Sequence, residues 1–229
     1  MESLGSFKNV DDNGVIIVPT DKTEEMKTRL EKILASNFIV LVDYRSAGYY
    51  VLALLEEGRP KLKSWKVKYR SQEYVEALSE DYKEFVEGKQ FMVLLETAFQ
   101  KFRDLHNLLQ TTDDYMADPE IPKQYEAIES AYKTFVSSAN DAGASLEQVL
   151  TSWTHFENNM TLITTWLEEQ QRITPSNVPV EILAKWKSLL ESIIRDGSFL
   201  IERTYEKTAT KISQRLKTLN HRWSKYVRL

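Results

Sequence analysis

The histidines are the side chains best suited to acid–base or metal chemistry, and their spacing argues against both. His106, His155 and His221 fall in three separate segments, and none is arranged with a second His or a carboxylate three or four residues away as a metal-binding set. The chain has no Cys, which excludes a thiol nucleophile and thiolate metal ligands. Glycine-rich phosphate loops and the Gly-x-Ser-x-Gly turn are also missing. We therefore expect no catalytic residue, no metal site and no cofactor, and predict that the protein is not an enzyme.

A run of cations offers the best candidate for binding. Six of the twelve residues from 59 to 70 are Lys or Arg, and none is acidic. On a continuous helix, four of these cations are spaced three or four residues apart and share one face. The candidate partner-binding residues are Arg59, Lys61, Lys63, Trp65, Lys66, Lys68, Tyr69 and Arg70.

Two interpretations of this run stay open. The cations could form an electrostatic docking patch for an acidic protein, such as an actin regulator, or for an anionic lipid surface. They could instead form a solvated helix face whose charges pair with the acids that follow in the sequence. The basic C-terminal segment presents a similar choice, between lateral binding to actin and an exposed coiled-coil face.

Helices must position these side chains, because the sequence is poor in residues that break helices. Only 7 Gly and 6 Pro occur among 229 residues, whereas 42% of the residues are apolar. A sandwich or barrel needs turn residues about every 8–12 positions, so both are excluded. Proline in a helix interior costs about 3 kcal/mol, and each of the four long Pro-free stretches is therefore expected to be helical. The prolines stand at positions 19, 60, 119, 122, 175 and 179.

The stretch between Pro122 and Pro175 has the clearest helical period. Apolar residues recur at spacings of three and four from Tyr125 to Leu167 without a slip. This pattern predicts one helix from about Pro122 to Gln171, roughly 70 Å long at about 1.5 Å per residue. A single compact domain of this size needs no helix of that length, so we expect the helix to connect two domains.

The other stretches predict shorter helices. The first begins near Asp21 and ends at Gly58-Arg59-Pro60. A second covers Leu78–Leu109, with a possible start at Pro60 and a kink near residues 70–72. Two more follow Pro179, with a turn between Asp196 and Lys207.

The predicted fold class is all-α, with two tandem three-helix bundles that share the long helix in an elongated molecule. We place a first, atypical bundle at residues 21–145 and a second at 146–229. Residues 1–20 are expected to form a disordered or strap-like tail.

Charge and hydropathy exclude other classes of protein. The chain has 30 cationic and 34 anionic side chains, a net charge of −4, which gives no bias toward nucleic acid. The longest uncharged runs have 10 residues, fewer than the roughly 17–25 of a membrane-spanning helix. The N-terminus does not resemble a signal peptide. We therefore expect a cytoplasmic protein that binds no nucleic acid.

Particular residues carry a resemblance to spectrin repeats. Ser152-Trp153-Thr154-His155-Phe156 and Trp166-Leu167 are similar to the first helix of a repeat. Leu219-Asn220-His221-Arg222-Trp223 resembles the end of a repeat, where Leu-Asn-x-Arg-Trp is typical, and the segment 128–132 takes that place in the first bundle, with Tyr132 for Trp. The side chains expected in the bundle cores are Tyr132, Phe156, Trp166, Leu167, Trp186, Leu219 and Trp223.

The divergent pattern is more similar to the repeats of dystrophins, nesprins and plakins than to those of spectrin, and a fragment of a giant nesprin is the specific expectation. The resemblance implies a structural, protein-docking fragment of a linker between the nuclear envelope and actin (the LINC complex). Implied partners are cytoskeletal proteins, such as an actin-associated regulator of the formin type or another linker protein.

The same resemblance implies a location at the cytoskeleton and the outer nuclear membrane, with membrane contact only through the parent protein. Two alternatives remain at this point. One is a helical module that binds anionic membrane surfaces, and the other is a plakin- or dystrophin-type scaffold repeat.

Overall fold

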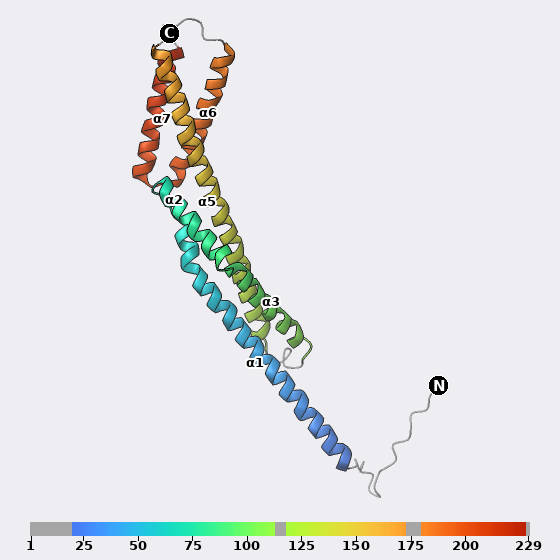
Figure 1. Ribbon diagram of the computed structural model, residues 1–229. Coiled ribbons are helices and arrows are strands. Elements are labelled where there is room, and N and C mark those ends of the chain that lie inside the picture. The colour runs from blue at the N-terminus through green and yellow to red at the C-terminus, as the bar shows by residue number, and fades with distance from the viewer. Residues whose placement is uncertain (1–19, 113–117, 173–179, 228–229) are drawn as a thin grey trace, which may run out of the picture. The chain divides into compact units, whose positions relative to one another are not determined.

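The computed structural model describes residues 20–112, 118–172 and 180–227 (Figure 1). The predicted tail therefore lies outside the described residues, apart from Thr20. Within the described ranges the chain is helical, which confirms the predicted all-α class. The helices are α1 (Thr20–Trp65), α2 (Gln72–Lys83), a π-helical turn η1 (Glu84–Gly88), α3 (Phe91–Leu109), α5 (Glu120–Arg172), α6 (Val180–Arg203) and α7 (Glu206–Val227).

The chain packs as two compact units, and three helices contribute to both. Unit 1 comprises Met1–Leu52 and Thr97–Glu129, whereas unit 2 comprises Ala53–Glu96 and Ser130–Leu229. The compact units group residues that pack together, whereas a repeat is a set of consecutive helices. The units therefore do not test the repeat boundary between residues 145 and 146, which stays a prediction.

Helix α5 agrees with the long helix that the apolar period predicts. It has 53 residues and includes Pro122 in its first turn, where a missing N–H costs little. Gly143 lies in its middle because Tyr82 of α2 packs against that position. A Cβ at Gly143 would stand 2.5 Å from the Tyr82 ring, so the close approach compensates for the poor helix propensity of glycine.

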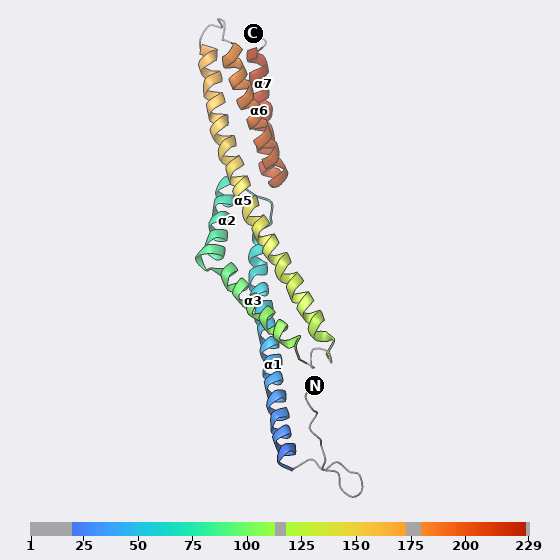
Figure 2. The same ribbon diagram turned by 90° about the vertical axis from the view of Figure 1, so that its right-hand side faces the viewer.

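In unit 2 the C-terminal part of α5 packs with α6 and α7 as a three-helix bundle (Figures 1 and 2). Phe156 and Leu167 are fully buried in this bundle. The Trp166 ring stacks on Trp186 with centroids 4.7 Å apart, and Trp186 is half-buried. Among the other expected core residues, Leu219 is buried and Tyr132 and Trp223 are half-buried.

Helix α1 ends later than the sequence predicts. The sequence predicts a stop at Gly58-Arg59-Pro60, but α1 continues through Pro60 to Trp65. Gly58 is needed for packing rather than for ending the helix, because a Cβ there would run into the rings of Phe135 and Phe91. The next helix therefore cannot begin at Pro60. It begins at Gln72, after Ser71, whose Oγ accepts from Tyr74 N at 3.3 Å.

The core of unit 1 is built around aromatic rings. Tyr44 and Phe102 are fully buried and stack with centroids 4.8 Å apart. Tyr44 Oη also donates to the Ile121 carbonyl oxygen at 3.1 Å. Because that carbonyl lies in the first turn of α5, the hydrogen bond ties α1 to the start of α5.

The part of α1 that precedes Tyr44 exposes many apolar side chains. In both views it continues past the unit 1 ends of α3 and α5 (Figures 1 and 2). The short uncharged runs of the sequence predict no membrane-spanning segment. By length and composition alone, the helical segment Glu24–Trp65 is long and apolar enough to cross a membrane. Core helices of soluble proteins meet the same criterion. The large apolar side chains exposed here are Met26, Leu30, Ile33, Leu34, Phe38, Ile39 and Val42.

His106 is enclosed in the aromatic core of unit 1. Its side chain is 4% exposed, and its ring stacks on Tyr125 with centroids 3.9 Å apart. Gln110 Nε2 lies 3.2 Å from His106 Nε2. Burial disfavours the charged imidazolium and lowers the pKa of His106, although Glu129 acts in the opposite direction.

Because this pKa is lowered, we expect unit 1 to lose stability as the pH falls below about 6.5, the ordinary value of the unfolded side chain. The unfolded chain then binds a proton that the buried ring resists. His106→Gln should reduce the pH dependence of the free energy of unfolding between about pH 8 and about pH 5. Urea titrations across this range measure the effect, with the exposed His155→Gln as the control. Equal slopes for the two variants would contradict the prediction.

Candidate partner-binding site

The basic segment is half helix and half loop. Because α1 ends at Trp65, residues 66–71 form a connection to α2. The expectation that Arg59, Lys63, Lys66 and Arg70 share one helical face is therefore wrong. Only the first two lie on α1, while Lys66 and Arg70 belong to the connection, which we call the basic loop (residues 66–71).

The basic loop is held by the turn between α6 and α7, far away in the sequence. Tyr69 N donates to the Arg203 carbonyl at 3.0 Å, and Tyr205 N donates to the Tyr69 carbonyl at 2.9 Å. This is an isolated parallel bridge between Tyr69 and Thr204. Thr208 Oγ1 adds a bond to the Arg70 carbonyl. These hydrogen bonds satisfy backbone groups of a segment that leaves the helical ladder, and so they explain why the helix can end here.

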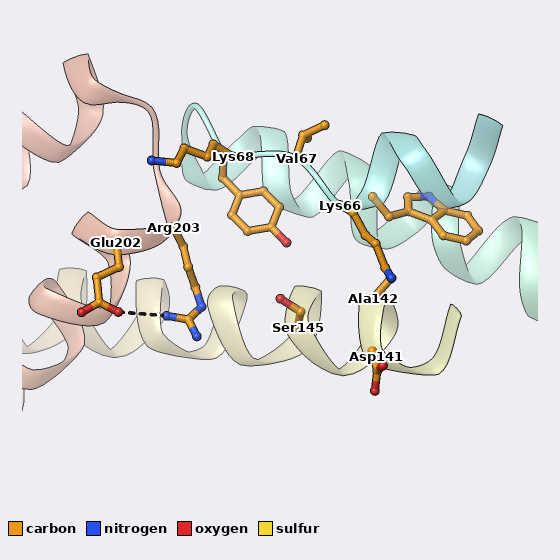
Figure 3. A pocket seen from close by; sticks show the side chains of 10 residues that line it. Lys66, Val67, Lys68, Asp141, Ala142, Ser145, Glu202 and Arg203 are labelled. Atoms are coloured by element: carbon orange, nitrogen blue, oxygen red, sulfur yellow. Dashed lines mark ion pairs between the residues drawn. The ribbon is translucent and has the colours of Figure 1, made fainter. Parts of the chain in front are cut away.

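The basic loop and the α6–α7 turn border a cavity of about 380 Å³, which we call the junction cleft (Figure 3). Lys66 and Lys68 line it from the loop, and Arg203 lines it from the end of α6. Asp141 and Ser145 of α5 complete the lining. The cleft lies within unit 2.

Trp65 and Tyr69 are not exposed contacts, which corrects two of the candidate partner-binding residues. Trp65 is 1% exposed and Tyr69 is 4% exposed. The Trp65 ring packs edge-on against Tyr82, with centroids 4.9 Å apart, and against Phe85 at 5.8 Å. Burial of such large rings stabilises the fold, so both residues belong to the core of unit 2 and not to a surface.

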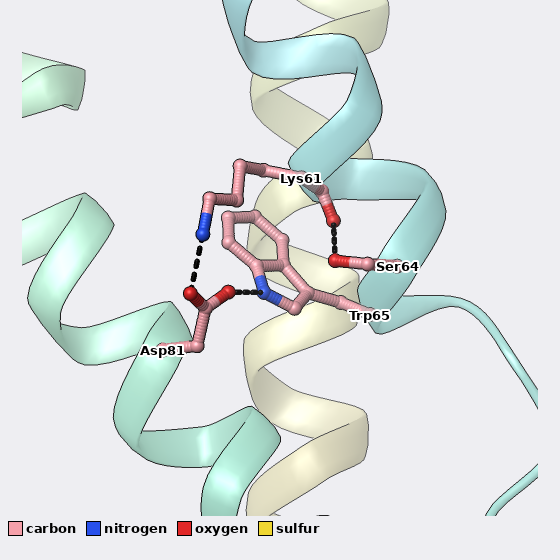
Figure 4. Close-up of polar contacts among 4 residues, drawn as sticks. All are labelled: Lys61, Ser64, Trp65 and Asp81. Atoms are coloured by element: carbon pink, nitrogen blue, oxygen red, sulfur yellow. Dashed lines mark hydrogen bonds and ion pairs between the residues drawn. The ribbon is translucent and has the colours of Figure 1, made fainter.

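Lys61 is also engaged, in a polar cluster that anchors the end of α1 to α2 (Figure 4). Its Nζ pairs with Asp81 Oδ1, and the Trp65 Nε1–H donates to Asp81 Oδ2 at 2.9 Å. Partial burial by itself raises the pKa of Asp81. The hydrogen bonds from Lys61 and Trp65 outweigh it, and the net pKa is lowered below the ordinary 3.8.

The remaining cations differ in their surroundings. Arg59 pairs with Glu56 at 3.2 Å along α1, and Arg70 lies over the rings of Tyr74 and Tyr205. Lys63, Lys66 and Lys68 are exposed. The structure thus brings Lys66 and Lys68 together at the cleft and places Arg59 and Lys61 elsewhere.

Sequence reasoning missed Arg203. The turn between Asp196 and Lys207 is predictable from the helical period, and this signal locates Arg203 near a helix end. The proximity of Arg203 to the basic loop is not predictable, because it depends on the bridge between Tyr69 and Thr204.

Other basic side chains of α7 serve the bundle. Arg215 donates to both carboxylate oxygens of Glu157, at 2.6 and 2.8 Å, and Arg222 lies 3.5 Å from Glu168. These pairs join α7 to α5, a geometry that favours the coiled-coil interpretation of the basic C-terminal segment. No group of three or more His, Asp or Glu side chains that could hold a metal occurs in the part of the chain that the structure describes.

The family described as "Nesprin-1, spectrin repeats" matches residues 54–228. The chain belongs to the nesprin spectrin-repeat family. This family is structural rather than enzymatic, and membership selects the nesprin expectation over the plakin and dystrophin types.

Two vertebrate relatives and an insect one show the same kinship. Human Nesprin-2 is 34% identical over 225 residues, and mouse Nesprin-2 is 31% identical over 224 residues, each covering 98% of this chain. Muscle-specific protein 300 kDa of Drosophila melanogaster is 21% identical over 229 residues, covering 91% of the chain. The chain spans only about 3% of the length of the Nesprin-2 relatives. No solved structure matches it.

Removing the Asp81 carboxylate should weaken the end of α1 in this nesprin-family chain. We expect Asp81→Ala to lower the free energy of unfolding by about 1–3 kcal/mol, because the buried Trp65 Nε1–H loses its acceptor. Asp81→Asn keeps an acceptor and should cost less. Since the pKa of Asp81 is lowered, the stabilisation is present above about pH 3.8 and is lost as the pH falls through the folded-state value.

Urea unfolding followed by tryptophan fluorescence measures this effect. Glu80→Ala changes an exposed neighbouring acid on the same helix and serves as the matched control. If Asp81→Ala is as stable as Glu80→Ala, the cluster does not anchor α1.

Proposed function

We propose that the chain is a structural spacer and protein-docking segment of a cytoskeletal linker. The observation that carries this proposal is the 53-residue helix α5, which takes part in both compact units. At about 1.5 Å per residue such a helix is about 80 Å long. The helix runs without a break over 53 residues, which is what a spacer requires.

The bridge between the basic loop and the α6–α7 turn supports the same role. The hydrogen bonds of Tyr69 join the segment after α1 to the end of α6, and so they provide a second link beside the backbone of α5. Tension along α5 would then act on helix hydrogen bonds and on this bridge together. A spacer of this design resists bending at the point where a loop would otherwise be free.

The partners in this proposal are cytoskeletal proteins, for example an actin-associated regulator of the formin type or another linker protein. The proposed location is the cytoskeleton, and the outer nuclear membrane when the longer parent protein is anchored there. We further propose that the chain has no catalytic activity and binds no nucleic acid. Membrane contact then arises only through the parent protein.

A second candidate function is binding to anionic membrane surfaces. The exposed apolar side chains of α1 before Tyr44 favour it, because apolar residues beside cations are typical of interfacial helices. The spacer is preferred because the acids Glu24, Glu25 and Glu31 stand among the cations of this part of α1. These acids weaken its attraction to an anionic surface.

Proline at position 142 tests the spacer. Ala142 is buried in α5, and a proline there removes a helix hydrogen bond and clashes one turn back, at a cost of about 3 kcal/mol or more. We expect the midpoint of thermal unfolding to fall by about 6–12 °C, with a changed solution-scattering profile.

Ala142→Gly is the control, since it costs only about 1 kcal/mol and keeps the backbone N–H. If Ala142→Pro melts and scatters like Ala142→Gly, α5 does not act as a continuous element and the spacer proposal fails.

Co-sedimentation with phosphatidylserine vesicles at low salt separates the two candidate functions. Under the spacer proposal the chain stays in the supernatant. Binding that disappears in the double variant Leu34→Glu with Phe38→Glu, which changes two exposed apolar residues of α1, would instead support the membrane function. Arg29→Glu tests whether charge alone explains such binding.

A further inference from the structure

The junction cleft gathers cations from two segments that are more than a hundred residues apart. Lys66 and Lys68 come from the basic loop, and Arg203 comes from the end of α6. Among the ion pairs of the described residues, none involves Lys66 or Lys68. Their side chains leave the basic loop in opposite directions (Figure 3). Two solvated ammonium groups therefore flank the cavity, and neither forms an ion pair with a protein carboxylate.

Arg203 is held in place by its own surroundings. Its guanidinium lies 3.7 Å from the centroid of the Phe199 ring. It also lies 3.6 Å from Glu202 Oε2, and a dashed line marks this ion pair in Figure 3. Its side chain is 37% exposed. A planar guanidinium fixed on an aromatic ring and still open to solvent is suited to pair with an external carboxylate.

The floor of the cleft adds a neutral donor and an acid. Ser145 of α5 is half-buried, and its hydroxyl points toward the cavity beside Arg203 (Figure 3). Asp141 lies one turn earlier and also lines the cleft. The wall is thus of mixed charge. A flexible acidic peptide can place its carboxylates at the cations and away from Asp141, whereas the regularly spaced phosphates of a nucleic acid cannot.

We propose that the junction cleft binds an acidic peptide segment of a protein partner, whose carboxylates pair with Lys66, Lys68 and Arg203. This inference rests on the docking part of the proposed function and names the chemistry of the docked segment. The mechanism is charge complementarity at a recessed surface, with the Ser145 hydroxyl as a further donor.

The same surface is poorly suited to lipid or nucleic acid. Trp65 and Tyr69 are buried, so they can neither insert into a bilayer nor stack on bases. Val67, the apolar residue between the two lysines, is only half-buried and small. Asp141 and Glu202 would repel closely spaced phosphates.

The site is composite, and its assembly depends on the bridge at Tyr69. The hydrogen bonds from Tyr69 N to Arg203 and from Tyr205 N to Tyr69 keep the lysines of the basic loop beside Arg203. Whenever these bonds open, the cations separate and the peptide loses part of its binding surface. The affinity for the acidic peptide should therefore depend on whether the basic loop is hydrogen-bonded to the α6–α7 turn.

Fluorescence anisotropy of a fluorescein-labelled hexaglutamate peptide with the full chain tests the proposal. We expect binding at low salt, weakened by added salt because the pairs are solvent-accessible. The double variant Lys66→Glu with Lys68→Glu should bind about tenfold more weakly or worse, since each reversal replaces an attraction by a repulsion. Arg203→Gln should weaken binding about threefold or more while leaving its backbone carbonyl free to accept from Tyr69.

The matched control is Lys185→Glu with Lys187→Glu, which makes the same change of charge at two exposed positions near the other end of α6. Over 16–18 residues of helix these lysines stand about 25 Å from the cleft. We expect this control to change the affinity by less than about twofold. Circular dichroism confirms that each variant is folded.

Several outcomes would overturn the proposal. Equal losses in the two double variants would show that net charge alone attracts the peptide. Absence of hexaglutamate binding at low salt would remove the site. Phosphatidylserine vesicles or a duplex oligonucleotide that bind the chain and are released by Lys66→Glu with Lys68→Glu, in place of hexaglutamate, would assign the cleft to lipid or nucleic acid.

Failure here is distinct from failure of the proposed function. If hexaglutamate does not bind but Ala142→Pro still lowers the melting point as expected, the spacer stands and the cleft is not a docking site. If the peptide binds and Ala142→Pro behaves like Ala142→Gly, the docking site stands without the spacer.

Discussion

Helix α5 has to bury apolar side chains on one stripe along almost its whole length, and the other helices are arranged to satisfy that requirement. In unit 1 the stripe contributes Ile121 and Ile128, and in unit 2 it continues to Leu167. Because the hydrophobic effect scales with the area removed from water, no part of α5 is stable without helices packed on it. In unit 1 the start of α5 packs with α1 and α3, and in unit 2 its C-terminal part packs with α6 and α7.

Small residues decide how closely these helices approach. Gly58 receives the ring of Phe135, and Gly143 receives the ring of Tyr82. The tight contact at Gly143 brings α2 onto α5, and the Asp81 cluster then fixes the end of α1 against α2. The basic loop starts from this fixed point, which is why it can reach the α6–α7 turn instead of fraying into solvent.

The proposed spacer and the proposed docking site depend on the same junction. The bridge at Tyr69 joins the segment that follows α1 to the end of α6. It also places Lys66, Lys68 and Arg203 at one cleft. A change in loop sequence there alters charge without disturbing the buried stripe of α5.

The spacing of apolar residues predicted most of the helices, because a helical period is a local property of the chain. The single helix expected over Leu78–Leu109 is wrong, since the structure divides this stretch into α2, η1 and α3, with Gln90 at φ 50° before α3. The same spacing predicted α5 to within two residues at each end and located the α6–α7 turn correctly. It could not show that Gly58 and Pro60 lie inside α1, since a nearby ring from α5 decides the role of Gly58. Nor could it show that Trp65 is buried or that Arg203 joins Lys66 and Lys68. Those facts depend on contacts between residues far apart in sequence, and only tertiary packing brings such residues together.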